Sequence, residues 1–340
     1  MTLATTTETP TSTADLASAA AQRERSVPAA NAAPATAPLV TIGMPVYNGE
    51  RHMRAALESL LAQDYSNFEL VISENGSTDA TRDICREYAS RDPRVRVHHQ
   101  PQHISAIENF TSVLALARGE YFMWAAVDDL WYPAFVREAA EELDRNPDAG
   151  VAMSAVDRIW DTGEAMDQIR FVGRDDINGK GYYKTIKACT SPKKYNLFVY
   201  GLFRTELLRG AMQVIPQVPN WDRLLVCQVA LAAPLRYIDQ VLHTRTNHRK
   251  PSHVRLPDEP FNRMTRMDPW VEAKTLGELA RMLVRSPVIP WPRKAAFAPL
   301  VLSRYGWLLL RGRLMPELKQ RFGPALWDRL APLRRLVVRR

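Results

Sequence analysis

The chain has 340 residues, of which 46% are hydrophobic and 24% are charged, as in globular proteins that bury a sizeable core. Its three cysteines, Cys85, Cys189 and Cys227, form no CxxC pair, which argues against a disulfide framework or a zinc site. The net charge of +8 is uneven, because residues 281–340 hold fourteen Lys and Arg against two Asp and Glu. We see no secretory signal and no apolar run long enough to span a membrane.

Residues 1–37 are rich in Ala, Thr, Ser and Pro and contain no aromatic residue, so we predict that they are disordered. After them, short apolar runs alternate with segments whose apolar residues recur at helical spacing. The runs that predict strands are 39–44, 68–73, 95–99, 121–125, 151–155 and 235–241. This alternation predicts an α/β domain over residues 38–250, with a Rossmann-like, mainly parallel sheet flanked by helices. We expect residues 251–340 to form a basic helical C-terminal extension, helical from Pro269.

The apolar run 121–125 leads directly to two adjacent carboxylates, Asp128 and Asp129. In an open parallel sheet, ligands bind at the carboxyl ends of the strands, which is where these two side chains are expected. Paired carboxylates suit a hard divalent cation, Mg²⁺ or Mn²⁺, that is shared with substrate phosphates. The alternative is that Asp128 and Asp129 only start the next helix, since Asp is a good N-cap.

Four blocks of the sequence resemble a known family: PVYNGE at 45–50, SENGSTDAT at 73–81, ARGEYFMW at 117–124 and VDDLWYP at 127–133. In this order and at these spacings they resemble the inverting, nucleotide-sugar-dependent glycosyltransferases of family two, which have a GT-A fold. The resemblance covers about residues 38–155 and continues more loosely to His248. It implies a nucleoside diphosphate sugar as donor and a divalent metal ion as cofactor.

The resemblance also implies which residues hold the nucleotide. Pro45, Tyr47 and Glu50 match the first-strand loop that holds the nucleotide, with Tyr47 against the base. Glu74 stands where the family usually has an aspartate that accepts a hydrogen bond from the nucleobase. Ala126 stands where the first aspartate of the DxD motif is usual, so only the adjacent pair of acidic residues remains.

The family chemistry implies roles for later residues. Negative charge grows on the departing diphosphate, and a metal ion held by Asp128, Asp129 and His248 would stabilise it. Asp128 would also contact the nucleotide. Arg245 falls where the family often has a loop beside the diphosphate, although a solvated basic loop is the alternative.

Inversion needs a base that deprotonates the acceptor hydroxyl from the opposite face of the sugar. Asp222, in NWDRLL, best matches the family's later Asp or Glu, and the alternative role is an N-cap of the following helix. Arg204, in YGLFRTELL, resembles the segment that lines the acceptor side, or it is an ordinary charge at a helix start. The sequence contains no QxxRW, which argues against a processive synthase.

The leading hypothesis is therefore a metal-dependent inverting glycosyltransferase that acts on a glycan or lipid-linked acceptor. The alternative is a degenerate GT-A module that binds nucleotide sugar or glycan without turnover, because Ala126 and SEN at 73–75 replace acidic residues. A nucleotidyltransferase is disfavoured, since PVYNGE is not a Gly-rich phosphate loop.

The C-terminal segment interleaves Trp and Leu with Arg, and its apolar residues share a helical face. Basic amphipathic helices of this kind bind anionic membrane surfaces, so we predict a cytoplasmic protein that is peripheral at the inner face of the membrane. Packing on the catalytic domain is the alternative. No nucleic-acid-binding motif accompanies the charge, and we expect no nucleic-acid partner.

Overall fold

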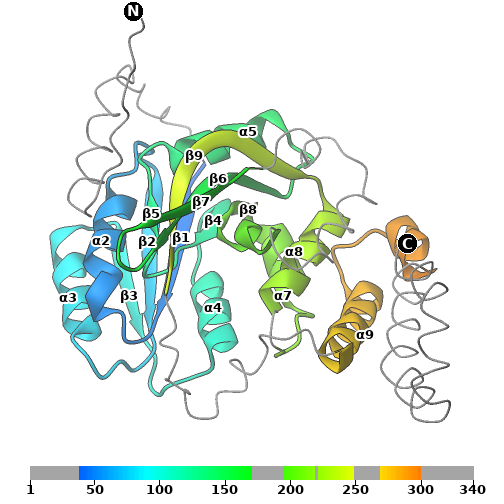
Figure 1. Cartoon of the computed structure of the whole chain (residues 1–340), viewed down its shortest axis with the longest axis horizontal. Helices are drawn as coiled ribbons and strands as arrows, with labels where there is room; N and C mark the ends of the chain where they lie inside the picture. The colour runs from blue at the N-terminus through cyan, green and yellow to red at the C-terminus, as the bar shows by residue number, and fades with distance from the viewer. Residues whose placement is uncertain (1–37, 171–194, 219–220, 249–268, 300–340) are drawn as a thin grey trace, which may run out of the picture. The chain divides into compact units, whose positions relative to one another are not determined.

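The computed structural model describes residues 38–170, 195–218, 221–248 and 269–299. The chain divides into two compact units, Met1–Gln213 with Trp221–Val254, and Val214–Asn220 with Arg255–Arg340. The described part of the first unit has a central sheet flanked by helices (Figure 1). This arrangement confirms the predicted α/β class.

The strands of the sheet are β1 (Val40–Val46), β2 (Phe68–Glu74), β3 (Val95–His99), β4 (Tyr121–Trp124), β5 (Leu130–Trp131), β6 (Val151–Trp160), β7 (Ala165–Ile169), β8 (Leu202–Arg204) and β9 (Leu235–Asn247). Among the described residues these nine strands form one sheet in the order β3-β2-β1-β4-β8-β6-β9-β5, and β7 pairs with β6. The first four strands in this order are parallel, and so are β6 and β9. Strands β5, β7 and β8 pair antiparallel, so the sheet is mixed.

The helices of the first unit are α2 (Glu50–Leu61), α3 (Thr81–Arg91), α4 (Ala106–Ala115), α5 (Phe135–Arg145), α7 (Thr205–Met212), α8 (Trp221–Ala232) and the 3-10 helix η2 (Tyr195–Tyr200). Helix α5 packs on β6 and β9, and α4 packs on β1 and β2. The helical spacing of apolar residues explains this packing. In the sequence of α5, Phe135, Val136, Ala139, Ala140 and Leu143 recur on one helical face, and these are the residues that the helix buries. A capping box between Ser105 and Glu108 fixes the start of α4.

The first strand is longer than predicted, because β1 continues past Met44 through Pro45 to Val46. The carbonyl of Gly43 accepts a hydrogen bond from Ala125 on the β4 side. The backbone nitrogen of Pro45, two residues further along the strand, is on that same side. The register of β4 against β1 ends at Gly43, so the missing N–H of Pro45 costs no ladder hydrogen bond. Pro45 therefore lies within the strand and not in the loop that follows it.

Strands β6 and β9 also extend beyond the predicted ranges, to Trp160 and Asn247. They pair in parallel along their length, with register shifts on both sides of Ala155. The expectation that Arg245 lies in a loop is wrong, since it is on β9, as is His243. Pairing with β6 provides hydrogen-bond partners for the backbone of this part of β9, and a partner strand elsewhere in the chain cannot be read from the sequence of β9 itself.

A buried aromatic cluster joins the end of β4 to the start of α8. The fully buried Trp124 has the rings of Phe122, Phe110, Phe203 and Trp221 around it, at centroid distances of 5.1, 5.7, 6.1 and 6.2 Å. Aromatic pairs in this range are mutually stabilising beyond their burial. The cluster holds two elements that carry candidate site residues at a fixed separation.

In the second unit, α9 (Pro269–Arg285) confirms the predicted helix from Pro269. No helix in the described part of the chain is long and apolar enough to cross a membrane. The predicted disordered segment 1–37 and the amphipathic segment within 300–340 lie outside the described residues.

Candidate active site

The loops that follow β1 and β2 are tied together by hydrogen bonds. Asn48, with a left-handed φ of 50°, donates its N–H to Ser77 Oγ at 3.0 Å, and its side chain accepts from Thr78 N at 2.9 Å. The Glu50 carboxylate accepts from Ala80 N at 3.1 Å. Ser77 and Thr78 do not cap α3, because Ala80 is its N-cap and both hydroxyl residues bond to Asn48. Glu50 thus joins the first loop to the start of α3.

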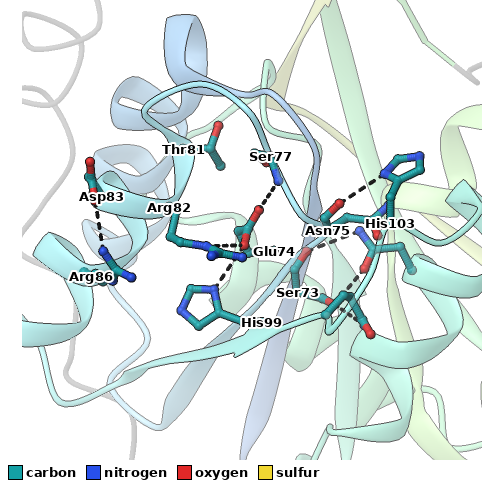
Figure 2. A network of polar contacts seen from close by, with 12 residues as sticks. Ser73, Glu74, Asn75, Ser77, Thr81, Arg82, Asp83, Arg86, His99 and His103 are labelled. Atoms are coloured by element: carbon teal, nitrogen blue, oxygen red, sulfur yellow. Dashed lines mark hydrogen bonds and ion pairs between the residues drawn. The ribbon is translucent and has the colours of Figure 1, made fainter.

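Glu74 ends β2 and its side chain is completely buried (Figure 2). One carboxylate oxygen accepts from Ser77 N at 2.5 Å, and the other accepts from Arg82 Nε and His99 Nδ1, both at 3.1 Å. Burial alone would raise the pKa of Glu74, but the hydrogen bonds from Ser77, His99 and Arg82 lower it to about 2. The carboxylate is therefore ionised and shapes the loop between β2 and α3.

An exposed aromatic pair lies beside this loop. Tyr47 is 46% exposed, and its ring centroid is 4.3 Å from that of His103. His103 Nδ1 donates to the carbonyl of Asn75 at 3.1 Å, which fixes the His103 ring (Figure 2). The structure thus places Tyr47 where a planar ligand could reach it. The sequence analysis did not name His103 as a site residue. The one indication was that His103 follows β3, and β3 pairs with β2 in the sheet.

Asp128 contacts His248 at the end of β9. Asp128 Oδ2 accepts from His248 Nε2 at 2.7 Å, and Asp161 Oδ2 lies 3.5 Å from His248 Nδ1. The hydrogen bond that His248 donates to Asp128 raises the pKa of His248 above its usual value, although burial acts in the opposite direction. Sequence reasoning placed Asp128 and His248 in the site and missed Asp161.

The donor set of Asp128 and His248 fits a divalent cation. Within the described residues no group of three or more His, Cys, Asp or Glu could hold a metal ion. Mg²⁺ sites that share substrate phosphates need only one or two protein ligands, because phosphate and water oxygens complete the coordination. The Asp128 carboxylate and the His248 imidazole, whose Oδ2 and Nε2 atoms are 2.7 Å apart, meet that requirement.

Asp129 has a different environment from its neighbour. It is only 2% exposed, and its two oxygens accept from His243 Nε2 at 3.1 Å and from Thr246 N at 2.9 Å. His243 is itself buried and stacks on Trp131 with ring centroids 5.0 Å apart. Asp129 therefore ties the loop after β4 to β9.

Asp222 lies in the first turn of α8, and its charge acts on Tyr200, as do those of the acidic pair. Burial raises the pKa of Asp222, and the opposing influences include a hydrogen bond from the backbone of Arg223 and the charge of Arg245. The half-buried Tyr200 links these groups, because its pKa is raised by burial and by the charges of Asp129, Asp128 and Asp222. The Arg245 guanidinium lies 5.9 Å from the centre of the Tyr200 ring. The fold thus brings Asp222 and Arg245 toward residues about a hundred positions away.

Arg204 binds carbonyl groups of the chain. Its Nε donates to Ala149 O at 2.9 Å and its Nη2 to Leu143 O at 2.8 Å, while the guanidinium lies over the Tyr121 ring at 5.5 Å. These contacts connect β8 to the end of α5. They are the contacts of a structural arginine.

Solved structures with this architecture identify the fold. The S. aureus protein TarS, residues 1–349, in complex with UDP-GlcNAc aligns with a TM-score of 0.57 at 17% identity, over 78% of this chain and 72% of that chain. The mannosyltransferase PcManGT from Pyrobaculum calidifontis, in complex with GDP-Man and Mn²⁺, aligns with a TM-score of 0.50 at 19% identity, over 94% of this chain and 87% of that chain. These likenesses confirm the GT-A fold of the glycosyltransferases.

The sequence comparison names the family. The model of "Glycosyl transferase family 2" matches residues 41–210, which is half of the chain, and the chain belongs to this family. It is 35% identical over 131 residues to "Putative glycosyltransferase EpsH" of Bacillus subtilis, covering 38% of this chain and 37% of the relative. It is 38% identical over 108 residues to "Uncharacterized glycosyltransferase RT0329" of Rickettsia typhi, covering 32% of this chain and 33% of the relative. The chain spans about a third of the length of these curated relatives.

Proposed function

We propose that this protein transfers a sugar from a nucleoside diphosphate sugar to a hydroxyl of a glycan or lipid-linked acceptor, with inversion at the transferred carbon. The observation that carries the proposal is the contact between Asp128 and His248, with Arg245 and Asp222 nearby, at the carboxyl ends of the strands. Membership of glycosyl transferase family 2 supports it. Two structural neighbours were solved with UDP-GlcNAc or GDP-Man, which supports this class of donor.

We infer that Asp128 and His248 hold Mg²⁺ or Mn²⁺. The ion would supply positive charge against the negative charge that develops on the departing diphosphate. Arg245 adds a permanent positive charge that acts on Tyr200 together with the charge of Asp128, and Asp129 holds the loop that presents Asp128. We therefore assign Asp129 to positioning, since both of its oxygens already accept hydrogen bonds from the chain.

Asp222 is the base in this proposal. A general base must be ionised yet retain proton affinity, and burial raises the pKa of Asp222 in that direction. Its place on the first turn of α8 keeps it rigid, because Trp221 packs against Trp124. From there it would accept the proton of the acceptor hydroxyl.

Tyr47 and His103 form the proposed platform for the nucleobase. Aromatic rings stack on any base, so this platform binds the nucleotide without fixing which base it carries. Glu74 has about one lone-pair position left after its three hydrogen bonds, and its side chain is fully buried. The geometry therefore favours a role for Glu74 in shaping the loop over the implied contact with the base.

We also infer that the basic C-terminal segment brings the enzyme to an anionic membrane surface. The support is compositional: fourteen Lys and Arg against two Asp and Glu in residues 281–340, with Trp307 and Trp327 among them.

Calorimetric titration with UDP, GDP and ADP, each with Mn²⁺ and with EDTA, tests the proposed site. We expect one nucleotide to bind more tightly with Mn²⁺, and the corresponding nucleotide sugar to release nucleoside diphosphate slowly by hydrolysis. Equal binding in EDTA and Mn²⁺ would contradict the metal assignment. Binding without release for every sugar and acceptor would favour the degenerate binding module, which Ala126 and Glu74 suggest.

A further inference from the structure

Both ring nitrogens of His248 face carboxylates. Nε2 lies 2.7 Å from Asp128, and Nδ1 lies 3.5 Å from Asp161. His248 is 47% exposed, whereas the side chain of Asp161 is only 18% exposed. On its Nδ1 side, the exposed imidazole of His248 therefore faces the carboxylate of Asp161, which is itself largely buried.

The topology of the sheet explains why Asp161 reaches His248 across 87 residues of sequence. Strands β6 and β9 run parallel, and their register ends with Trp160 opposite Asn247. The next residue of each strand, Asp161 and His248, therefore lies at the same end of the pair. The Asp161 N–H also donates to Asn247 O at 2.9 Å, which closes the end of the ladder.

A tight turn makes Asp161 a rigid support. Gly163 N donates to Trp160 O at 2.8 Å, and Trp160 N donates to Glu164 O at 2.8 Å. Gly163 has a φ of 87°, which a residue with a side chain rarely adopts. The turn fixes the backbone of Asp161 and so limits where its carboxylate can lie.

We propose that Asp161 is a positioning residue that orients His248 as a metal ligand, an inference that rests on the proposed function. A metal ion on Nε2 needs that nitrogen without its proton, so the remaining proton lies on Nδ1. Without an ion, Nε2 donates its proton to Asp128. With an ion in place of that proton, Asp161, whose Oδ2 is 3.5 Å from Nδ1, would accept the Nδ1 proton and leave the lone pair of Nε2 for the ion. Carboxylates that contact a ligating histidine in this way typically account for about 10- to 100-fold in metal affinity.

The test measures Mn²⁺ affinity by electron paramagnetic resonance, with saturating UDP or GDP, whichever the wild type binds more tightly. Asp161→Ala should raise the Mn²⁺ dissociation constant about 10- to 100-fold and leave nucleotide binding in EDTA unchanged. Asp161→Asn, which keeps an acceptor oxygen, should fall between the wild type and Asp161→Ala. Asp157→Ala is the matched control, because Asp157 lies on β6, the strand that leads to Asp161, and accepts a hydrogen bond from Gln168.

A double-mutant cycle shows whether Asp161 acts through His248. In a His248→Gln background, Asp161→Ala should have no further effect on Mn²⁺ affinity. Equal effects in both backgrounds, or a wild-type Mn²⁺ affinity in Asp161→Ala, would overturn the inference. If Asp161→Ala lowers the melting temperature, Asp161→Asn replaces it in the cycle, and a wild-type Mn²⁺ affinity in Asp161→Asn would then overturn the inference. A wild type that binds no Mn²⁺ would instead overturn the proposed function.

Discussion

The buried carboxylate of Glu74 gives a stability prediction that can be worked out from the structure. In the unfolded chain the pKa of a Glu is near 4.5, and in the fold the pKa of Glu74 is about 2. At 1.36 kcal/mol per pKa unit, the ionised carboxylate contributes about 3 kcal/mol to the free energy of unfolding at neutral pH. The side chain is fully buried, so solvent screening does not reduce this figure much.

The sign of the pH dependence follows from the lowered pKa. The contribution of Glu74 is complete above pH 4.5 and declines as the pH falls toward 2, because the unfolded chain binds the proton first. Glu74→Gln removes the charge and keeps the shape of the side chain. The variant should lose about 3 kcal/mol at pH 7, and the difference from the wild type should shrink below pH 4.5.

Urea unfolding followed by tryptophan fluorescence at pH 7, 5, 4 and 3 measures this difference. Asp83→Asn on the neighbouring helix is the matched control, because its ion pair with Arg86 is exposed, at 78% and 65% (Figure 2). That variant should change stability by less than about 1 kcal/mol at any pH. A cost of Glu74→Gln that stays constant from pH 7 to pH 3 would refute the assignment of a depressed pKa to this network.

Three single variants separate the roles in the site, and a truncation tests the role of the tail. Asp128→Ala should abolish the Mn²⁺ dependence of nucleotide binding at an unchanged melting temperature. Asp129→Ala should instead cost about 1–3 kcal/mol in urea unfolding, because it leaves His243 buried without its partner. Asp222→Asn should lower kcat about 10²- to 10⁴-fold with normal nucleotide affinity, and near-normal kcat would move the base elsewhere. A chain ending at residue 299 should lose salt-sensitive sedimentation with anionic liposomes; sedimentation like that of the full chain would assign the tail a structural role.

The alternation of strands and helices could be predicted because it depends on local periodicity. The face of α5 that the sequence predicts is the face that packs on β6 and β9. The ends of strands could not be predicted as well, because they depend on a partner strand elsewhere in the chain. Residues 243–247 contain polar residues typical of a loop, yet they pair with the second half of β6 as part of β9.

The same limit applies to the site. The acidic ends of the strands pointed to one edge of the sheet, and the charges of Asp128, Asp222 and Arg245 all act on Tyr200; their roles there stay predictions. Asp161 and His103 were missed, because their importance comes only from neighbours in space. Their place at the ends of β6 and β3 was a usable signal, since the end of each strand in a parallel pair meets the end of its partner.

Ala126 stands where the family usually has the first aspartate of the DxD motif. The different environments of Asp128 and Asp129 bear on whether this difference implies a loss of catalysis. Asp129 is tied to β9 through His243 and Thr246, and this leaves Asp128 directed at His248. In our proposal, His248 supplies the second protein donor to the metal ion. A carboxylate at position 126 is then not needed to complete the coordination, because phosphate oxygens of the donor provide the rest. The substitution at 126 therefore gives no physical reason to prefer a binding module over an enzyme.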